Sequence, residues 1–147
     1  MKKLLLICSL AFVGMSFLTE KETSSQSTEE GIQFQTLSLE DAKKQSLKSG
    51  KLIFIDAYAS WCGPCKRMAA TSFKNQEVGK VYNEQFINLK IDCEKDADGP
   101  ELARMYKVKA YPTLLVIDGN GKLIKEVVGM QMEDGLLALA NSLKKKK

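Results

Sequence analysis

Two cysteines separated by two residues carry the clearest chemistry in this sequence, in the stretch Trp61-Cys62-Gly63-Pro64-Cys65. Such a pair can be a structural disulfide, half of a metal site or a redox couple. A structural zinc site usually takes four Cys or His ligands, but the chain has no histidine and only this one close pair of cysteines. The composition therefore argues against structural zinc and against any mechanism that needs an imidazole base.

The residues around the pair predict where it lies in the fold. Residues 51–59 read KLIFIDAYA, a nearly continuous apolar run that indicates a strand covered on both faces. Pro64 is tolerated in the first turn of a helix, which residues 65–73 can continue. Cys62 should then lie where a central strand turns into a helix. Unpaired N–H groups and the positive end of the helix dipole meet there and stabilise a thiolate, which lowers the Cys62 pKa below the ~8.5 of a free thiol.

A thiolate at Cys62 gives the pair a mechanism. Cys65, three positions along the helical turn, should lie close to Cys62 but deeper, less exposed and less ionised. Because the thiolate is the species that attacks disulfides, Cys62 would form a mixed disulfide with a substrate. Cys65 would then resolve it and release the reduced substrate, while Trp61 offers a flat apolar surface beside the nucleophile.

A lone carboxylate, Asp56, interrupts the apolar run six residues before Cys62. A buried charge is costly unless it has a partner or a task. We expect a raised pKa that lets Asp56 accept the proton of Cys65 as resolution begins. The alternative is a structural aspartate held by hydrogen bonds.

A proline stands directly before another apolar strand, in the motif Tyr111-Pro112-Thr113. Proline removes a backbone donor at the beginning of the strand. A cis bond before Pro112 would be a specific feature of a tight turn, although X-Pro bonds are more often trans. The sequence by itself leaves the isomer open.

These motifs together resemble the thioredoxin superfamily, over residues 31–143. WCGPCK is the active-site sequence of thioredoxins, and Asp56, the YPT motif and Gly129 after a predicted hairpin all fall where the family has equivalents. The resemblance implies an α/β thioredoxin fold, with a central mixed β-sheet flanked by helices on both faces. It also implies that Cys62 is the nucleophile, Cys65 the resolving thiol and Asp56 the buried proton acceptor.

The resemblance further implies a cis peptide at Pro112 that packs against the cysteine pair and docks substrate backbone. The substrate-binding residues that it implies are Trp61, Gly63, Pro64, Tyr111, Pro112 and Gly129. Residues 39–68 and 72–118 are more similar to exported thioredoxin-like proteins of bacteria than to the cytosolic form. Asn88 stands where cytosolic thioredoxins usually carry a lysine near the buried aspartate, so the resemblance does not extend to how the pKa of Asp56 is tuned. The segment from Asp92 to Pro112 is a few residues longer, which could change partner choice.

The hydrophobic pattern predicts the order β-α-β-α-β-α-β-β-α. Ser38 with Asp41 suggests a helix N-cap, and Leu39, Ala42 and Leu47 should share one face of that helix. Gly119-Asn120-Gly121 predicts a hairpin. The expected strands are 31–37, 51–59, 86–92, 113–118 and 122–129, and the expected helices are 38–50, 64–73, 75–86, 99–108 and 132–143.

The two ends of the chain differ from its body. Residues 1–18 have the charge and apolar order of a signal peptide, with an uncleaved membrane anchor as the alternative. Residues 19–30 read as a disordered linker, residues 31–143 as the folded domain and residues 144–147 as a basic tail. Without Lys2, Lys3 and that tail, 22 basic residues become 16 against 18 acidic ones. The body is nearly neutral, so nucleic acid is not an expected partner.

Gly-Pro between the cysteines resembles the reducing branch of the family, because strongly oxidising members carry Pro-His there. We therefore expect a cofactor-free, monomeric reductase of protein disulfides in the periplasm or otherwise outside the cytoplasm, supplied by a membrane thiol–disulfide electron donor. The alternatives are an oxidase or isomerase of secreted proteins, and a non-catalytic peptide-binding module in which the disulfide is structural. Cys93 is expected to be a buried free thiol, with a regulatory or intermolecular role as the alternative.

Overall fold

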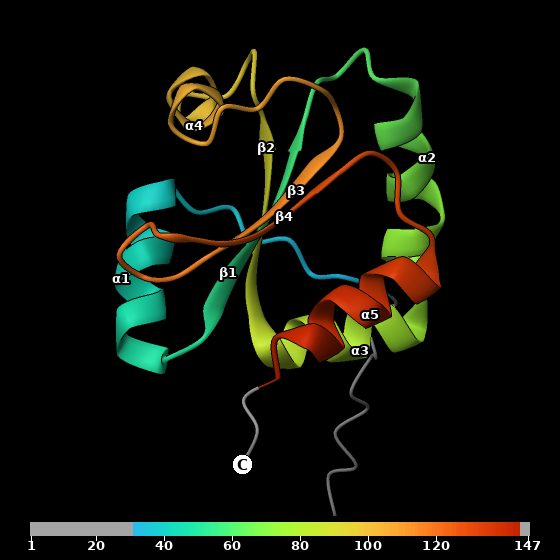
Figure 1. Cartoon of the computed structure of the whole chain (residues 1–147), viewed down its shortest axis with the longest axis horizontal. Helices are drawn as coiled ribbons and strands as arrows, with labels where there is room; N and C mark the ends of the chain where they lie inside the picture. Colours follow the sequence, from blue (N-terminus) through green and yellow to red (C-terminus); the bar gives the residue numbers. More distant parts are fainter. Residues whose placement is uncertain (1–30, 145–147) are drawn as a thin grey trace, which may run out of the picture.

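The computed structural model describes residues 31–144, which form a sheet with helices on both sides (Figure 1). In chain order the elements are α1 (Leu39–Ser49), β1 (Leu52–Tyr58), α2 (Gly63–Ala70), the 3₁₀ helix η1 (Ser72–Lys74), α3 (Gln76–Gln85), β2 (Phe86–Asp92), α4 (Gly99–Met105), β3 (Thr113–Ile117), β4 (Leu123–Val128) and α5 (Glu133–Ser142).

The sheet is mixed, with the strand order β2-β1-β3-β4. β1 and β2 run parallel, whereas β1 with β3 and β3 with β4 run antiparallel. A parallel pair needs a crossover connection, which α2, η1 and α3 supply. The carboxyl ends of β1 and β2 therefore meet at one edge of the sheet, and the chain leaves β1 there toward the cysteine pair.

Side chains alternate across the sheet and divide the core in two. One core lies between the sheet and helices α1 and α4, and it takes Ile53 and Ile55 from β1. The other lies between the sheet and helices α2, α3 and α5, and it takes Phe54. Figure 1 shows the two sets of helices on opposite sides of the strands. This confirms the predicted mixed sheet and the prediction that β1 is covered on both faces.

The first predicted strand, residues 31–37, is wrong. This segment makes isolated backbone hydrogen bonds, from Ile32 N–H to Phe73 O at 2.7 Å and from Gln35 N–H to Asn88 O at 2.8 Å. Its apolar side chains differ in burial: Ile32 is buried, Phe34 is half-buried against the ring of Phe73 with centroids 5.2 Å apart, and Leu37 is exposed. The alternation of Ile32 and Phe34 therefore reflects their contact with the core, and the segment is not a strand.

Three helix predictions also need correction. The predicted helix 99–108 stops at Met105, before Lys107, whose φ is +54°. The predicted helix 64–73 stops at Ala70, because Thr71 leaves the helical conformation and η1 begins after it. In α1, Leu47 is 62% exposed and Ser46 takes its predicted place in the core. At about 100° per residue, position 46 lies closer than position 47 to the direction of Leu39. The predicted cap is confirmed, since the Asp41 N–H donates to Ser38 Oγ at 3.1 Å.

The predicted signal peptide and linker, residues 1–30, lie outside the described residues, as does most of the basic tail. Within residues 31–144, none of the helices combines the length and the apolar character needed to span a membrane.

Candidate functional site

Cys62 lies at the amino end of α2, directly after the turn that follows β1. It is the N-cap of the helix, with an extended backbone, and Pro64 occupies the first turn. The Cys65 N–H donates to Cys62 Sγ at 3.2 Å, and the two cysteines form a disulfide. The strand-to-helix turn predicted from the sequence thus exists. One of the backbone donors left free by the first helical turn is aimed at the predicted nucleophile.

Burial does not separate the two sulfur-bearing residues. Cys62 is 3% exposed and Cys65 is 2% exposed, so the predicted difference in depth is absent in the disulfide form. In the disulfide form both cysteine side chains pack with Ala59, and Tyr58 and Tyr111 pack against this small cluster. Among the hydrogen bonds of residues 31–144, the one that reaches this disulfide is donated by the Cys65 N–H to Cys62 Sγ. A difference in reactivity between the two sulfur atoms must therefore come from electrostatics and not from burial.

Trp61 projects beside the disulfide with 65% of its surface exposed. Its indole N–H donates to Glu94 Oε2 at 2.8 Å, and its ring packs edge-on against Tyr111 with centroids 5.9 Å apart. The loop after β2 and the turn before β3 thus fix an exposed aromatic ring. Glu94 was not predicted, because its pairing with Trp61 depends on how two distant loops meet.

The turn before β3 contains a cis peptide bond between Tyr111 and Pro112, as the family resemblance implied. Pro112 O accepts a hydrogen bond from the Gly129 N–H at 2.8 Å. Gly129 has φ = +94°, a backbone conformation that favours glycine. The predicted substrate-binding residues therefore come from three separate segments, and of those outside residues 61–65 Tyr111 packs against the cysteine pair. Gly63 and Pro64 are exposed at the start of α2.

Asp56 lies on β1 and is completely buried, on the side of the sheet that faces α2. Burial raises its pKa, and the ammonium group of Lys90 offsets part of that rise. Asp56 Oδ2 accepts a hydrogen bond from Lys90 Nζ, whereas Oδ1 has no protein partner. A carboxyl group whose pKa is raised by burial accepts a proton more readily than an ordinary aspartate does.

Lys90 corrects the expectation about Asn88. The parallel register pairs Asp56 with Lys90, whereas Asn88 is opposite Phe54 and its amide donates to Asn83. The lysine near the aspartate is therefore present, two residues further along β2. Lys90 could have been singled out from the sequence, because a lysine inside an apolar strand is as unusual as an aspartate there. Only the strand register shows that Lys90 lies beside Asp56.

A small pocket of about 170 Å³ is lined by one member of the cysteine pair, Cys65, and by one member of the ion pair, Lys90. Cys65, Tyr58 and Lys90 line it, and the Lys90 ammonium lies 3.9 Å from the centroid of the Tyr58 ring. The cavity gives Lys90, which is 25% exposed, a position between solvent and the buried carboxyl group of Asp56. Cys65 and Lys90 thus face the same pocket, and Asp56 lies behind Lys90, to which it is hydrogen-bonded.

Cys93 is free and buried at the end of β2. Burial raises the pKa of its thiol to about 11. A thiol of this kind is almost entirely protonated near neutral pH and is a poor nucleophile. Within residues 31–144, the side chains that commonly bind metals do not cluster in groups of three or more.

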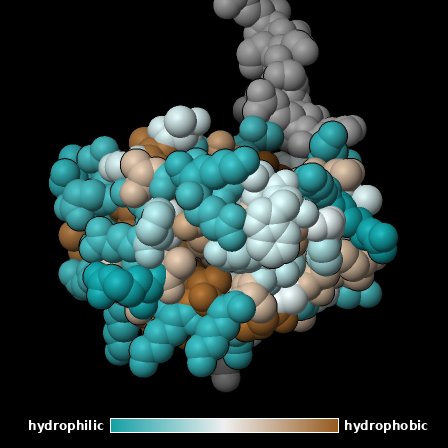
Figure 2. All heavy atoms as spheres, turned by 90° about the horizontal axis from the view of Figure 1, so that it is seen from above, coloured by the Kyte–Doolittle hydropathy of each residue, from teal (hydrophilic) through white to brown (hydrophobic). Residues whose placement is uncertain are grey.

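Figure 2 looks onto the end of the molecule where β1 and β2 stop. The surface there is mostly hydrophilic, with patches of intermediate hydropathy toward the middle and small apolar areas between them. This end of the molecule therefore presents a surface of mixed hydropathy.

Substitution of Asp56 by asparagine should stabilise the oxidised protein more at pH 8 than at pH 4. Because the native pKa of Asp56 is raised above its ordinary value of 3.8, folding favours the protonated form. The stability that this form contributes is lost as the pH rises through the native pKa. We expect the free energy gained by Asp56→Asn to be roughly 1–3 kcal/mol larger at pH 8, measured by urea unfolding of the disulfide form.

The matched control is Asp134→Asn, which makes the same change at an exposed position on α5. It should leave the pH dependence of unfolding as it is in the wild type. A gain for Asp56→Asn that is equal at both pH values, or larger at pH 4, contradicts the raised pKa.

The four-stranded mixed sheet, with a CxxC disulfide at the start of α2, defines a thioredoxin-fold thiol–disulfide oxidoreductase domain. The thioredoxin family model matches residues 33–142, so the chain belongs to the thioredoxin family. The solution structure of a Bacteroides thetaiotaomicron protein assigned as a disulphide-isomerase is 37% identical, with a TM-score of 0.67. The match covers 79% of this chain and 98% of that one.

Two curated relatives show the same relationship. Chloroplastic thioredoxin F2 of Arabidopsis thaliana is 36% identical over 89 residues, which are 60% of this chain and 44% of the relative. Protein disulfide-isomerase of Ricinus communis is 31% identical over 132 residues, which are 88% of this chain and 24% of the relative. The chain thus spans less than half of the length of these two proteins.

Proposed function

We propose that this protein reduces protein disulfides outside the cytoplasm, through a mixed disulfide with Cys62. The observation that carries the proposal is the position of Cys62 at the N-cap of α2, where the Cys65 N–H points at its sulfur. Such a donor stabilises the thiolate that attacks a disulfide. Trp61 and the cis Pro112 turn flank the disulfide and offer a surface for the substrate chain.

The residues around the disulfide support a two-step exchange. In the first step the Cys62 thiolate attacks a substrate disulfide, and one substrate sulfur leaves as a thiolate. In the second step Cys65 loses its proton to Asp56 and attacks Cys62 Sγ, which forms the disulfide seen here and expels the second substrate sulfur. Two electrons pass from the dithiol to the substrate, and the expelled thiolates take up protons. The raised pKa of Asp56 supports its role as the acceptor.

The direction of the reaction depends on how strongly the reduced form is stabilised. Gly63 and Pro64, between the cysteines, add no positive charge beside Cys62, and the chain has no histidine to do so. We therefore expect a reduction potential near the ~−270 mV of thioredoxin. The measurement is redox equilibration of the purified protein against dithiothreitol buffers, with insulin reduction as the activity assay.

A potential near the ~−120 mV of strong oxidants contradicts the reductase proposal and favours an oxidase. An isomerase is the second candidate, because the relatives from Ricinus communis and Bacteroides thetaiotaomicron bear that assignment. An isomerase would restore activity to scrambled ribonuclease without net consumption of reductant, whereas a reductase consumes it in proportion to the disulfides broken.

The proposed location rests on the signal-like order of charge and apolar residues in residues 1–18. Outside the cytoplasm, a dithiol must be re-reduced after each turnover. We propose a membrane thiol–disulfide relay as that donor, with the protein acting as a monomer. No organic cofactor is needed for the exchange, because the sulfur atoms carry the electrons.

A further inference from the structure

A second cavity lies beside the disulfide, at the exposed start of α2. Its volume is about 400 Å³, and it is lined by Gly63, Pro64, Arg67 and Met130. Cavities that bind small groups fall in the range of about 300–1,000 Å³. It shares no lining residue with the small cavity that contains Lys90. The proposed exchange gives it no role.

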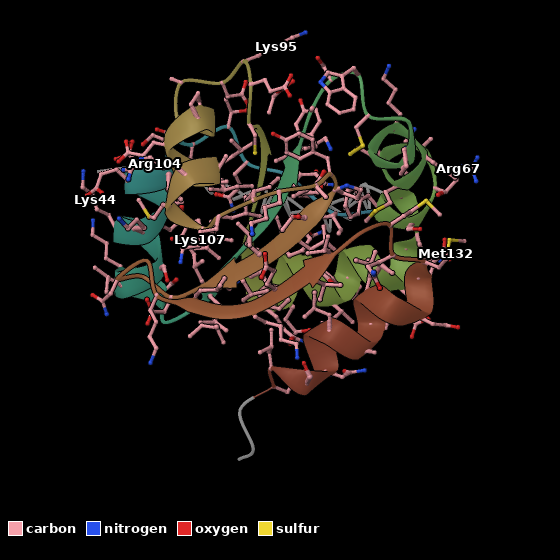
Figure 3. All side chains as sticks on the ribbon, turned by 45° about the horizontal axis from the view of Figure 1, so that its top comes forward. Lys44, Arg67, Lys95, Arg104, Lys107 and Met132 are labelled. Atoms are coloured by element: carbon pink, nitrogen blue, oxygen red, sulfur yellow. A yellow bond between two sulfur atoms is a disulfide. The ribbon has the colours of Figure 1, made fainter. Side chains whose placement is uncertain are left out.

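The helical repeat explains why Arg67 lines this cavity. Residues three and four apart lie on one face of a helix, so Arg67 shares a face of α2 with Pro64 and Gly63. In Figure 3, Arg67 on α2 and Met132 before α5 lie on the same side of the molecule. The opposite wall of the cavity is Met130. It follows Gly129, whose N–H is bonded to Pro112 O, so this wall is attached to the cis-proline turn.

Arg67 is an unpaired cation at this position. Its side chain is exposed, and among residues 31–144 it has no carboxylate oxygen within 4.0 Å. On the other side of the disulfide, Glu94 places a carboxylate against Trp61. The Glu94 carboxylate is thus engaged by Trp61, whereas the charge of Arg67 is available to a substrate.

We propose that this cavity binds an acidic side chain, glutamate or aspartate, that flanks the reactive cysteine of a substrate. Arg67 is then a specificity-determining residue: its guanidinium binds the carboxylate, while Met130 and Pro64 contact the methylene groups. The inference rests on the proposed function, because a substrate reaches the cavity only while its sulfur is at Cys62. Arginine suits this task since its planar group can bind a carboxylate through two hydrogen bonds.

The test measures how fast the reduced, full-length protein is oxidised by peptide disulfides. Each substrate is a pair of identical peptides joined through their single cysteines. In one series Glu, Gln or Lys stands two residues before the cysteine, and in the other series it stands two residues after it. Reactions are quenched with acid and separated by chromatography, at 20 mM and 500 mM salt. The proteins are the wild type, Arg67→Gln, Arg67→Lys and the control Arg104→Gln. Arg104 is exposed on α4, far from Arg67 in Figure 3.

We expect the wild type to prefer Glu over Lys by about 3- to 10-fold in at least one series at low salt, with Gln between them. High salt should weaken the preference. Arg67→Gln should abolish it, Arg67→Lys should retain part of it, and Arg104→Gln should match the wild type.

Equal rates for Glu, Gln and Lys peptides in both series overturn the inference while leaving the proposed function intact. The same holds if Arg67→Gln keeps the full preference. If the wild type is oxidised by none of the peptides, including the uncharged ones, the proposed function fails and the inference fails with it.

Discussion

Replacement of Cys62 by serine should lower insulin reduction by at least about 10³-fold, because the variant lacks the only sulfur that the exchange places at the helix terminus. A serine hydroxyl at the N-cap can still accept the Cys65 N–H, so the helix should begin as before. The expected loss of insulin reduction is therefore due to the missing sulfur and not to misfolding. Unfolding of the reduced variant and the reduced wild type in urea checks this point.

Replacement of Cys65 by serine should be equally inactive in turnover but should behave differently with a substrate. The first step remains available, so Cys62 should accumulate a mixed disulfide that mass spectrometry can detect and that names the client. The matched control is Cys93→Ser, which alters the buried thiol at the end of β2 and should change turnover by less than about twofold. Wild-type turnover in both Cys62→Ser and Cys65→Ser would falsify the catalytic proposal and favour a binding module with a structural disulfide.

Replacement of Phe54 by alanine should reduce the free energy of unfolding by about 3–5 kcal/mol, the usual cost of deleting a buried aromatic ring. Phe54 is completely buried on β1. Its ring contacts four others, with centroids 4.8 Å from Tyr82, 6.2 Å from Phe86, and 6.4 Å from both Phe34 and Phe73. The substitution removes the centre of the core between the sheet and helices α2 and α3, so several contacts are lost together.

Urea unfolding of the disulfide form measures this loss, with Leu47→Ala as the control. Leu47 is 62% exposed on α1, and its truncation should cost less than about 1 kcal/mol. A loss for Phe54→Ala no larger than that of the control would show that the aromatic cluster does not hold this face of the sheet.

Much of the site was predictable because its chemistry is local in the chain. Cys62 and Cys65 lie on one helical turn, and the apolar run of β1 followed by Pro64 predicts the turn that places them. Asp56 was conspicuous as a carboxylate in that run. The family resemblance supplied the cis bond before Pro112, which the local sequence had left open.

The predictions that failed depended on contacts between distant segments. The alternation of Ile32 and Phe34 suggested a strand, but the chain there makes only scattered backbone hydrogen bonds, one to Phe73 in η1 and one to Asn88 in β2. Asn88 was given the position of a lysine that lies at residue 90. A shift of two residues keeps the same face of a strand, so the side-chain pattern could not reveal the error.

The sequence by itself determined the chemistry of this protein: which sulfur atoms exchange, and on which kind of helix terminus they lie. Only the tertiary structure decided what surrounds them. Lys90 meets Asp56, and Glu94 meets Trp61, across 34 and 33 residues of chain. Arg67 and Met130 likewise share a cavity although they belong to different elements. Local periodicity places a side chain on a face, whereas strand register and helix packing decide what lies opposite that face.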